Sequence, residues 1–372
     1  MNNKPIQITR RRALELSGVA ALAAFAAACS RATDTATNPT TSPAQGIPTG
    51  APSANSPTSL PGVGTGTSGE IPTPSSSDAV MTTPNKDFYI TSAFQLRPQV
   101  PDNWKLTITG LVDNPLSLTL DDIKQFNPFE EMRTFECISN PVGGTLIGNA
   151  IWKAVRLADV LEKAGIQPTT KEVKIEAFDS YVTSVPLETV LDQKSLLAFE
   201  MNGEPLPIEH GYPLRVIFPG RYGMKQPKWL KTMTAIDDHF LGFWEAQGWS
   251  NDAFVLPNSQ ITVPEDGDAV QAKGLQIRGV GFADGNDGVA KIDVSFDNGK
   301  TWQETTLVRG PNPYVWTNWA WQGDVPVGAD VLLARVTTNS GKTQEQQSVS
   351  LLGGTFPNGT SAIHQIVVNA KA

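Results

Sequence analysis

The alternation of apolar and polar residues predicts strands throughout residues 83–256. Trp104–Gly110 alternates in the manner of a strand with one buried face. Val173–Phe178 and Pro213–Phe218 are further strand candidates. The segment Arg133–Cys137 also alternates, so that its first, third and fifth side chains share one side if it is a strand.

Short helices are predicted between these strands. Thr119 is placed to cap a helix that begins with Leu120, because a threonine hydroxyl can accept a bond from a free amide of the first turn. Leu157–Ala164 repeats apolar residues at helical spacing and is followed by Gly165, a common helix terminator. Strands mixed with helices, without a regular βαβ rhythm, predict an α+β domain over residues 83–256.

Residues 257–372 have a different pattern, with short runs of alternating apolar and polar residues and no helical stretch. The runs are Leu275–Val280, Ala290–Phe296, Thr301–Leu307, Val331–Thr337 and Ile363–Val368. Turn pairs such as Asp284-Gly285 and Ser340-Gly341 separate them. This pattern predicts an all-β sandwich of immunoglobulin type. We expect Trp302, Trp316, Trp319 and Trp321 to supply much of its core.

The first 28 residues are typical of an export signal. Arg10, Arg11 and Arg12 precede an apolar run, Leu16–Ala28, that is too short to span a bilayer. The paired arginines resemble a twin-arginine signal, and the alanines before Cys29 resemble a lipoprotein cleavage site. We therefore expect an exported protein held by a lipid on Cys29 to the outer face of the cytoplasmic membrane, in the periplasm or at the cell surface. An ordinary cleaved signal is the alternative.

Residues 29–82 are predicted to be a disordered tether. Thr, Ser, Pro, Ala and Gly make up 38 of the 50 residues from Arg31 to Val80. Such a segment has too little apolar surface to offset the entropy lost on ordering. It would join the lipid anchor to the folded part of the chain.

Composition narrows the chemistry that the chain can perform. A formal charge of −8 argues against a nucleic-acid partner, since phosphate neutralisation needs a basic surface. Three histidines and two cysteines argue against a multi-histidine metal site, a thiolate cluster and a disulfide framework. Cys137 is thus the one cysteine of the predicted folded part, and a lone cysteine is more often a small buried apolar residue than a reactive one. Its functional alternative is a soft thiolate ligand to a transition metal whose other ligands come from a cofactor.

The surroundings of Cys137 resemble the sulfite oxidase family of molybdopterin enzymes. The resemblance covers about residues 83–372 and rests on four ordered motifs. These are Thr83–Tyr89; Cys137–Asn140 with Gly143, Gly144, Gly148, Asn149, Trp152 and Leu157; His210–Arg215 with Pro219, Gly220, Gly223–Lys225 and Lys228–Leu230; and Ile292–Trp302. The last is similar to the signature of the immunoglobulin-like domain of that family.

The resemblance implies a role for each matching residue. Cys137 would be the protein ligand to molybdenum, which is carried by a single molybdopterin. The residues that would bind the pterin or its phosphate are Asn85, Phe88, Tyr89, Asp179, His210, Arg215, Gly223, Met224, Lys225 and Lys228. An arginine suits a phosphate because its fork donates two parallel hydrogen bonds. As alternatives, Asn85 and Asp179 could form turns, and Lys228 could be a solvated charge.

Departures from the family pattern bear on the substrate. Sulfite-oxidising members have an arginine where Thr91 lies here, further arginines at Pro141 and Val142, and an active-site tyrosine that aligns with Trp249. Burying a dianion without matching positive charge costs several kcal/mol. Sulfite and nitrate are therefore disfavoured unless Arg97, Arg133 or Arg221 compensates. With Trp244 near the mouth, an uncharged or organic substrate is expected, with Trp249 as a catalytic-site residue.

These observations predict a molybdenum-dependent oxidoreductase that transfers an oxygen atom to or from a small molecule. No Cys-x-x-Cys-His heme motif occurs, so electrons would pass to an external carrier, a cytochrome or a membrane component. The resemblance also implies a homodimer formed through the sandwich. Two alternatives are a solute-binding or adhesive lipoprotein on the same scaffold, and a member that binds the cofactor without turning over.

Overall fold

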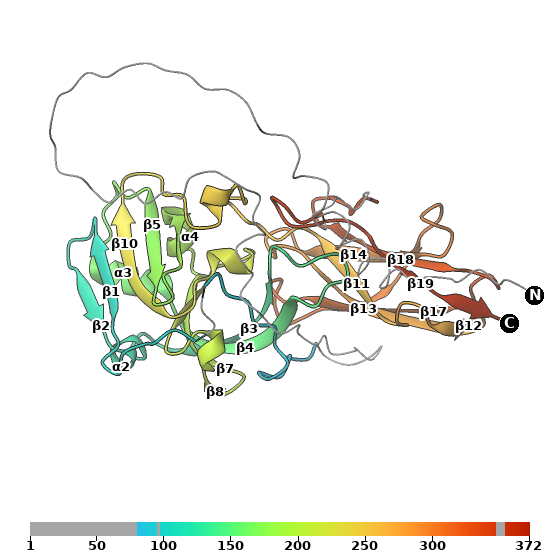
Figure 1. Ribbon diagram of the computed structural model, residues 1–372, viewed down its shortest axis with the longest axis horizontal. Helices are drawn as coiled ribbons and strands as arrows, with labels where there is room; N and C mark the ends of the chain where they lie inside the picture. The colour runs from blue at the N-terminus through green and yellow to red at the C-terminus, as the bar shows by residue number, and fades with distance from the viewer. Residues whose placement is uncertain (1–79, 95–96, 347–353) are drawn as a thin grey trace, which may run out of the picture. The chain divides into compact units, whose positions relative to one another are not determined.

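Two β-sheets make up the first part of the chain in the computed structural model, which describes residues 80–94, 97–346 and 354–372. The first sheet has the order β2-β1-β10-β5-β6, and Figure 1 shows β2, β1, β10 and β5 side by side. Its strands are β1 (Leu106–Gly110), β2 (Leu116–Leu118), β5 (Glu172–Ala177), β6 (Val182–Pro186) and β10 (Leu230–Ile236). Strands β1 and β10 are parallel and the other neighbours are antiparallel. The predicted strands at Trp104–Gly110 and Val173–Phe178 are thus confirmed, shifted by one or two residues.

The second sheet carries the segment that ends at Cys137. It has the order β3-β4-β7-β8, with β9 paired to β7, and all of its pairs are antiparallel. Its strands are β3 (Phe129–Glu136), β4 (Ile147–Arg156), β7 (Leu196–Met201), β8 (Glu204–Pro205) and β9 (Arg215–Ile217). The loop between β3 and β4 therefore begins at Cys137.

Short helices join these strands. The α-helices are α2 (Leu120–Ile123), α3 (Leu157–Ala164) and α4 (Leu187–Leu191), and the 3₁₀ helices are η1 (Ile208–His210), η2 (Gly223–Lys225) and η3 (Glu245–Gln247). Thr119 caps α2 as predicted, in a reciprocal capping box with Asp122. Gly165 ends α3 in the left-handed conformation, with φ 67°. The α+β prediction holds only in a coarser form, because this part of the chain is rich in sheet and its helices are short.

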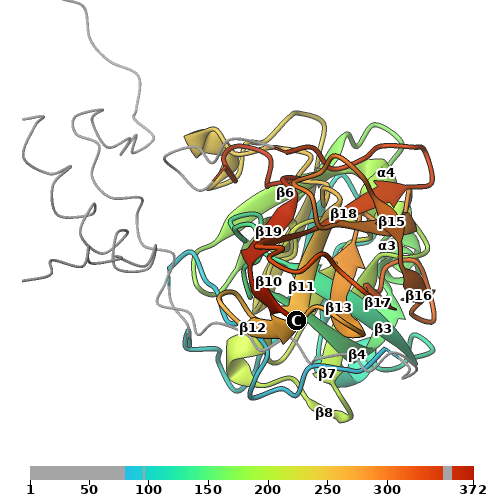
Figure 2. The same cartoon turned by 90° about the vertical axis from the view of Figure 1, so that its right-hand side faces the viewer.

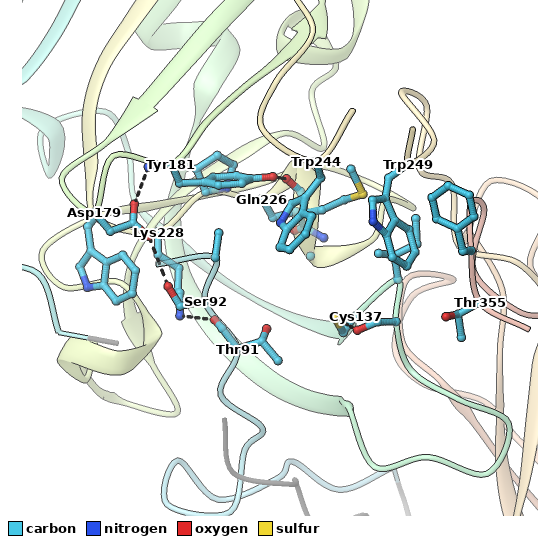
Figure 3. A pocket seen from close by; sticks show the side chains of 18 residues that line it. Thr91, Ser92, Cys137, Asp179, Tyr181, Gln226, Lys228, Trp244, Trp249 and Thr355 are labelled. Carbon is cyan, nitrogen blue, oxygen red and sulfur yellow. Dashed lines mark hydrogen bonds between the residues drawn. The ribbon is translucent and has the colours of Figure 1, made fainter. Parts of the chain in front are cut away.

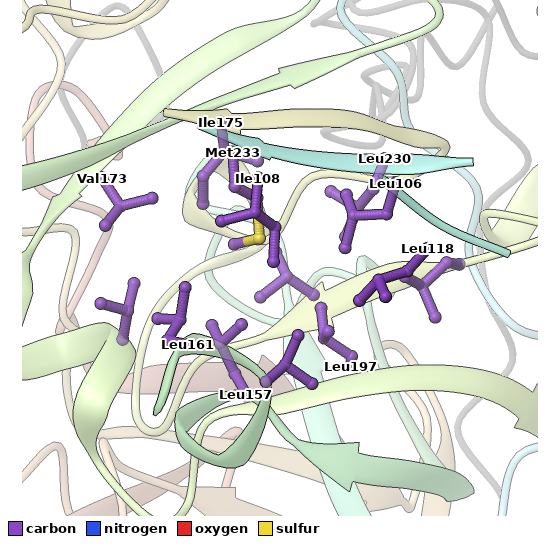
Figure 4. Packing of buried hydrophobic residues seen from close by; sticks show 14 of the residues in the cluster. Leu106, Ile108, Leu118, Leu157, Leu161, Val173, Ile175, Leu197, Leu230 and Met233 are labelled. Atoms are coloured by element: carbon purple, nitrogen blue, oxygen red, sulfur yellow. The ribbon is translucent and has the colours of Figure 1, made fainter. Parts of the chain in front are cut away.

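One apolar core lies between the first sheet and helix α3 (Figure 4). Leu106 and Ile108 of β1, Ile175 of β5 and Met233 of β10 contribute side chains that are at most 1% exposed. The apolar stripe of α3, which includes Leu157 and Leu161, covers them. The alternation of each strand and the helical spacing of α3 meet in this core, which explains why both patterns could be read from the sequence.

The described part of residues 257–372 forms two four-stranded antiparallel sheets. One has the order β11-β13-β17-β16 and the other β15-β14-β18-β19, and a parallel pair β12-β20 lies beside them (Figure 2). The strands are β11 (Asn258–Val263), β12 (Ala269–Gln271), β13 (Leu275–Phe282), β14 (Val289–Ser295), β15 (Gln303–Glu304), β16 (Thr306–Val308), β17 (Thr317–Gly323), β18 (Val331–Thr338), β19 (His364–Val367) and β20 (Asn369–Lys371). The two sheets share one core, so the predicted sandwich-like packing is observed.

The tryptophans of this region do not all enter that core. Trp319 is 1% exposed within it, and Trp321 packs against its edge. Trp316, also 1% exposed, belongs instead to a cluster with Ile138 and Tyr222 of the first part of the chain. Trp302 lies under the Arg335 guanidinium, whose central carbon is 3.9 Å from the ring centroid. The prediction that these four tryptophans supply much of the sandwich core was therefore wrong for Trp316 and Trp302.

The predicted export signal, Cys29 and the tether up to residue 79 lie outside the described residues. Within the ranges that the structure describes, no helix is long and apolar enough to cross a membrane.

Candidate active site

A cavity of about 270 Å³ opens beside Cys137, at the point where β3 ends (Figure 3). Its walls come from segments far apart in the sequence: residues 91–93, the residues after β3, the loop after β5, the region of helix η2, the residues on either side of helix η3, and residues 355–356. Predicted site residues that line it are Cys137, Asp179, Gly223, Met224, Lys228 and Trp249. Two of the four sequence motifs, those of Cys137 and of Gly223–Leu230, therefore converge on one cavity.

Cys137 presents a partly exposed thiol to this cavity. Its amide donates to the carbonyl of Leu146 at 2.9 Å, and its sulfur lies 3.1 Å from Ser139 Oγ. Burial raises the pKa of the thiol, while the Ser139 hydroxyl acts in the opposite direction by stabilising the thiolate. A thiolate at this position consequently needs a strong positive partner, such as a metal ion.

Three basic side chains lie close together at this cavity: Lys228 belongs to its wall, and Arg215 and His210 lie outside the wall. Arg215 Nη1 donates to the His210 carbonyl at 3.2 Å, and Lys228 Nζ donates to the carbonyls of Thr91 and Glu209 at 2.8 Å. Gly211, at φ 119°, allows this approach, since a Cβ there would lie 3.1 Å from Arg215 Cβ and 3.2 Å from Lys228 Cβ. Among the described residues, all three side chains lack a carboxylate partner within ion-pair distance.

Burial without an anion depresses the pKa of each of these groups. The pKa of Lys228 falls to about 7, first through burial and then through the charge of Arg215. Burial also lowers the pKa of His210 to about 4 and that of Arg215 to about 10. Arg215 Nε is buried with no hydrogen-bond partner in the structure. A bound phosphate would supply the missing negative charge and acceptors, so these residues fit an anionic cofactor.

The motif Thr83–Tyr89 contacts His210, one of the three basic residues. Asn85 Nδ2 donates to the Met201 carbonyl at 3.1 Å, and the Asn85 carbonyl lies 3.2 Å from His210 Nε2. Phe88 stacks on Tyr89 and packs edge-on against His210, with ring centroids 5.3 and 5.4 Å apart. None of these residues lines the cavity itself, so in this structure they position His210 rather than face the cavity.

Lys225 has a different environment from the other predicted phosphate ligands. Its ammonium forms a buried ion pair with Glu245 and also donates to Asn251 Oδ1 at 3.0 Å and the Ser184 carbonyl at 2.9 Å. The side chain is 1% exposed and is not part of the cavity wall. The structure thus places Lys225 inside the protein, where it holds η2 to η3.

The mouth of the cavity is aromatic. Trp249 lies edge-on to both Trp244 and Phe356, with ring centroids 6.4 and 5.2 Å apart. Phe356 belongs to residues 257–372, so both parts of the chain build the mouth. Only Lys228 and Asp179 carry formal charge among the described lining residues.

Asp179 lies in the wall of the cavity that the loop after β5 forms. It accepts hydrogen bonds from Ser92 Oγ at 3.3 Å and the Tyr181 amide at 3.0 Å, as Figure 3 shows. Burial raises the pKa of its carboxyl group, with Lys228 acting in the opposite direction. Tyr181 Oη donates to the Met224 carbonyl at 2.6 Å and so ties this wall to η2.

Several lining residues escaped the sequence analysis. They are Ser92, Ala93, Ile138, Ser139, Tyr181, Gln226, Pro227, Trp229, Thr355 and Phe356. Ile138, Ser139 and Trp229 lie inside the recognised motifs and could have been found from them, and Gln226 and Pro227 lie between two segments of one motif. Phe356 carries no local signal, because only the fold brings it to Trp249.

Comparison with known proteins identifies the family. The description "Oxidoreductase molybdopterin binding domain" matches residues 94–244, and "Mo-co oxidoreductase dimerisation domain" matches residues 253–358. The sulfite oxidase of Arabidopsis thaliana is 30% identical over 273 residues, which cover 59% of this chain and 70% of that protein. The chain belongs to the sulfite oxidase family of molybdopterin oxidoreductases. Its cofactor is accordingly molybdenum carried by molybdopterin.

Two other relatives match different shares of this chain. The mitochondrial sulfite oxidase of Macaca fascicularis is 33% identical over 292 residues, 66% of this chain and 54% of that one. The chain thus spans about half the length of this mammalian relative. The uncharacterized oxidoreductase YuiH of Bacillus subtilis (strain 168) is 37% identical over 158 residues, 41% of this chain and 78% of that one.

A solved structure supports the fold. The sulfane dehydrogenase SoxCD from Paracoccus pantotrophus superposes with a TM-score of 0.66. The match covers 78% of this chain and 84% of that one at 23% identity, so it is a likeness of fold alone.

Proposed function

We propose that this protein transfers an oxygen atom to or from a small uncharged organic molecule, for example as an S-oxide or N-oxide reductase. The observation that carries the proposal is the cavity beside Cys137, whose described wall has one cation, one anion and an aromatic mouth. In the reductive direction, the substrate gives up one oxygen atom, and two electrons and two protons convert that atom to water. The cofactor, when bound, supplies the two-electron redox chemistry.

Residues of the chain would bind and orient the cofactor. The Cys137 thiolate would be the protein ligand to the metal, as a soft sulfur donor suits a heavy transition metal. Arg215, Lys228 and His210 would surround the phosphate, and their depressed pKa values would rise once its charge arrives. Asp179 and the η2 backbone would flank the pterin.

The same walls favour an uncharged substrate over sulfite or nitrate. The arginines that could have compensated for a missing positive charge are engaged elsewhere. Arg97 pairs with Glu209, Arg133 pairs with Glu131 at 3.2 Å, and Arg221 lies over the Phe254 ring with its central carbon 4.3 Å from the centroid. None of the three lines the cavity. Trp244, Trp249 and Phe356 would instead contact an apolar part of the substrate and exclude water.

We also propose an exported, lipid-tethered homodimer with the immunoglobulin-type sandwich as the dimerisation domain. The signal-like residues 1–28, Cys29 and the matched dimerisation domain support this proposal. Electrons would pass to an external carrier, a cytochrome or a membrane component, since the sequence contains only 2 cysteines.

A substrate screen tests the proposal. Protein loaded with cofactor would be assayed for reduction of S-oxides, N-oxides and nitrate with a reduced viologen, and for sulfite oxidation with ferricyanide. We expect kcat/KM for at least one organic oxide to exceed that for sulfite and nitrate. A higher kcat/KM for sulfite than for every organic oxide would refute the substrate class. A fully loaded protein without turnover would favour the non-catalytic alternatives.

A further inference from the structure

Strand β11 presents two polar side chains to the Cys137 segment. Because side chains alternate along a strand, Asn258 and Gln260 point to one side of β11, and Ser259 and Ile261 point to the other. Ser259 Oγ donates to the carbonyl of Ala334 on β18, so its side faces the sandwich. Asn258 and Gln260, 8% and 4% exposed, face residues 136–144.

The first of these side chains holds the residue before Cys137. Asn258 Nδ2 donates to Glu136 Oε2 at 2.8 Å, and Glu136 Oε1 accepts from Asn140 Nδ2 at 2.9 Å. Asn140 Oδ1 in turn accepts a hydrogen bond from the Leu146 amide at 2.9 Å. The carbonyl of Leu146 accepts a hydrogen bond from the Cys137 amide. A continuous chain of hydrogen bonds therefore runs from β11 through Glu136 to the backbone of Cys137.

The second side chain holds the far end of the loop. Gln260 Nε2 donates to the Gly144 carbonyl at 2.7 Å. His364 of β19 lies so close to Gly143 that a Cβ at that position would collide with its imidazole ring. The ring is itself fixed, because its Nδ1 accepts from the Ile261 amide at 2.8 Å. Residues of the sandwich therefore contact the loop that starts at Cys137 near both of its ends.

We propose that the sandwich positions the metal-binding cysteine, with Asn258 and Gln260 as its positioning residues. The inference rests on the proposed function in that Cys137 is taken as the metal ligand. The loop between β3 and β4 has no regular structure of its own over residues 137–146. Its backbone therefore depends on contacts from outside, and β11 supplies them at both ends. The second part of the chain would then serve the active site of its own subunit as well as a dimer interface.

Hydrogen exchange of the full-length protein tests this proposal without relying on activity. Asn258→Ala and Gln260→Ala would be prepared from a host that lacks molybdopterin synthesis and compared with the wild type. Peptides covering residues 137–146 report the amides of Cys137, Asn140, Gly144 and Leu146, all of which donate hydrogen bonds in the structure. We expect exchange to accelerate about fivefold for each substitution, the effect of losing one ordinary hydrogen bond.

Ser259→Ala is the matched control. It removes buried hydrogen bonds from the same strand, but on the side away from the loop. It should leave exchange of residues 137–146 within twofold of the wild type, even if it lowers the unfolding temperature. Equal acceleration in Ser259→Ala, or none in the other two variants, would overturn the proposal.

Pterin content provides a second readout in protein from a competent host. Under limiting cofactor, Asn258→Ala and Gln260→Ala should retain less pterin than Ser259→Ala. If the wild type itself carries no pterin, the proposed function fails, while the exchange experiment still decides whether β11 positions the loop.

Discussion

The ammonium of Lys225 is paired with the carboxylate of Glu245 in the interior, where both side chains are at most 1% exposed. Glu245 Oε1 also accepts a hydrogen bond from Thr183 Oγ1 at 2.6 Å. The pair therefore joins helix η2, which forms a wall of the cavity, to helix η3, which follows Trp244. It explains how a cationic residue of the pterin-phosphate motif can serve the site without facing it.

Removing one partner of this pair should destabilise the protein strongly. Lys225→Ala leaves the Glu245 carboxylate buried without its cation, and we expect the free energy of unfolding to fall by about 3–5 kcal/mol in cofactor-free protein. Urea unfolding measures the change. Lys231→Ala, which removes an exposed cation of the next strand, should change it by less than ~0.5 kcal/mol. Wild-type stability in Lys225→Ala together with loss of pterin would instead make Lys225 a phosphate ligand.

Arg215 should matter for the loaded protein much more than for the cofactor-free one. Its guanidinium lies over Phe135 and Trp152, with ring-centroid distances of 4.3 and 5.0 Å, and meets only carbonyl acceptors. Arg215→Met keeps an apolar stem there, so we expect cofactor-free stability within ~1 kcal/mol of the wild type. Pterin content should fall at least about tenfold, because the phosphate loses its two-pronged donor.

A matched arginine provides the control for this prediction. Arg156 lies over the Phe129 ring, 5.0 Å from its centroid, at the end of β4 and away from the cavity. Arg156→Met should keep the wild-type pterin content. An Arg215→Met protein that also keeps it would remove Arg215 from the phosphate site.

His210 should make the cofactor-free protein sensitive to acid. Its pKa is lowered to about 4, so between pH 6.5 and 4 the unfolded state gains a proton that the folded state does not. The free energy of unfolding therefore falls as the pH falls through this window, by about 2–3 kcal/mol for this residue. Denaturant unfolding from pH 7 to pH 4 should show a smaller loss in His210→Gln than in the wild type.

Two other groups titrate in the same pH window, so their effects on stability have to be separated from that of His210. His364, whose pKa is also lowered to about 4 by burial, adds a loss of the same sign. Glu136, whose pKa burial raises to about 7, acts in the opposite sense. The change in the free energy of unfolding with pH is accordingly compared between each variant and the wild type, because the wild-type value itself varies with pH. A His210→Gln curve that coincides with that of the wild type would show that His210 is already charged in the folded protein.

The aromatic mouth should set the preference for bulky substrates. Trp249→Ala removes the ring that contacts both Trp244 and Phe356. For an aryl sulfoxide we expect KM to rise about 10- to 30-fold, with a smaller change for dimethyl sulfoxide. Trp302→Ala, which removes a tryptophan stacked on Arg335, should leave both KM values unchanged. Equal changes for the two sulfoxides would argue against an apolar subsite.

Local patterns in the sequence were sufficient for most elements but not for the contacts between them. Thr119 begins α2 through its side chain and Gly165 ends α3 through its backbone, so these predictions needed no knowledge of the fold. The resemblance to the family placed Cys137, Asp179 and Lys228 in one site because it carries spatial information that periodicity lacks. The Lys225–Glu245 pair and the Asn258–Glu136 bond join residues 20 and 122 positions apart, and no local signal announces them.

The α+β prediction overstated the helical part of the fold for a related reason. Hydrophobic spacing identified α3, yet it could not show that α2 stops after 4 residues. It gave no prediction for α4, which has 5 residues. Likewise, four tryptophans in an all-β segment suggested one core, whereas Trp316 faces the first part of the chain. The side to which an apolar side chain points at a boundary between domains is decided by the partner surface.

The most direct test of the account is the cofactor content of Cys137→Ser. Molybdenum would be measured by mass spectrometry, and pterin by fluorescence after acid oxidation, in protein purified from a molybdopterin-competent host. We predict about one molybdenum and one pterin per wild-type chain, and loss of the metal with a folded protein and no turnover in Cys137→Ser. Wild-type protein without metal or pterin, or a Cys137→Ser variant with full metal content and activity, would contradict the account.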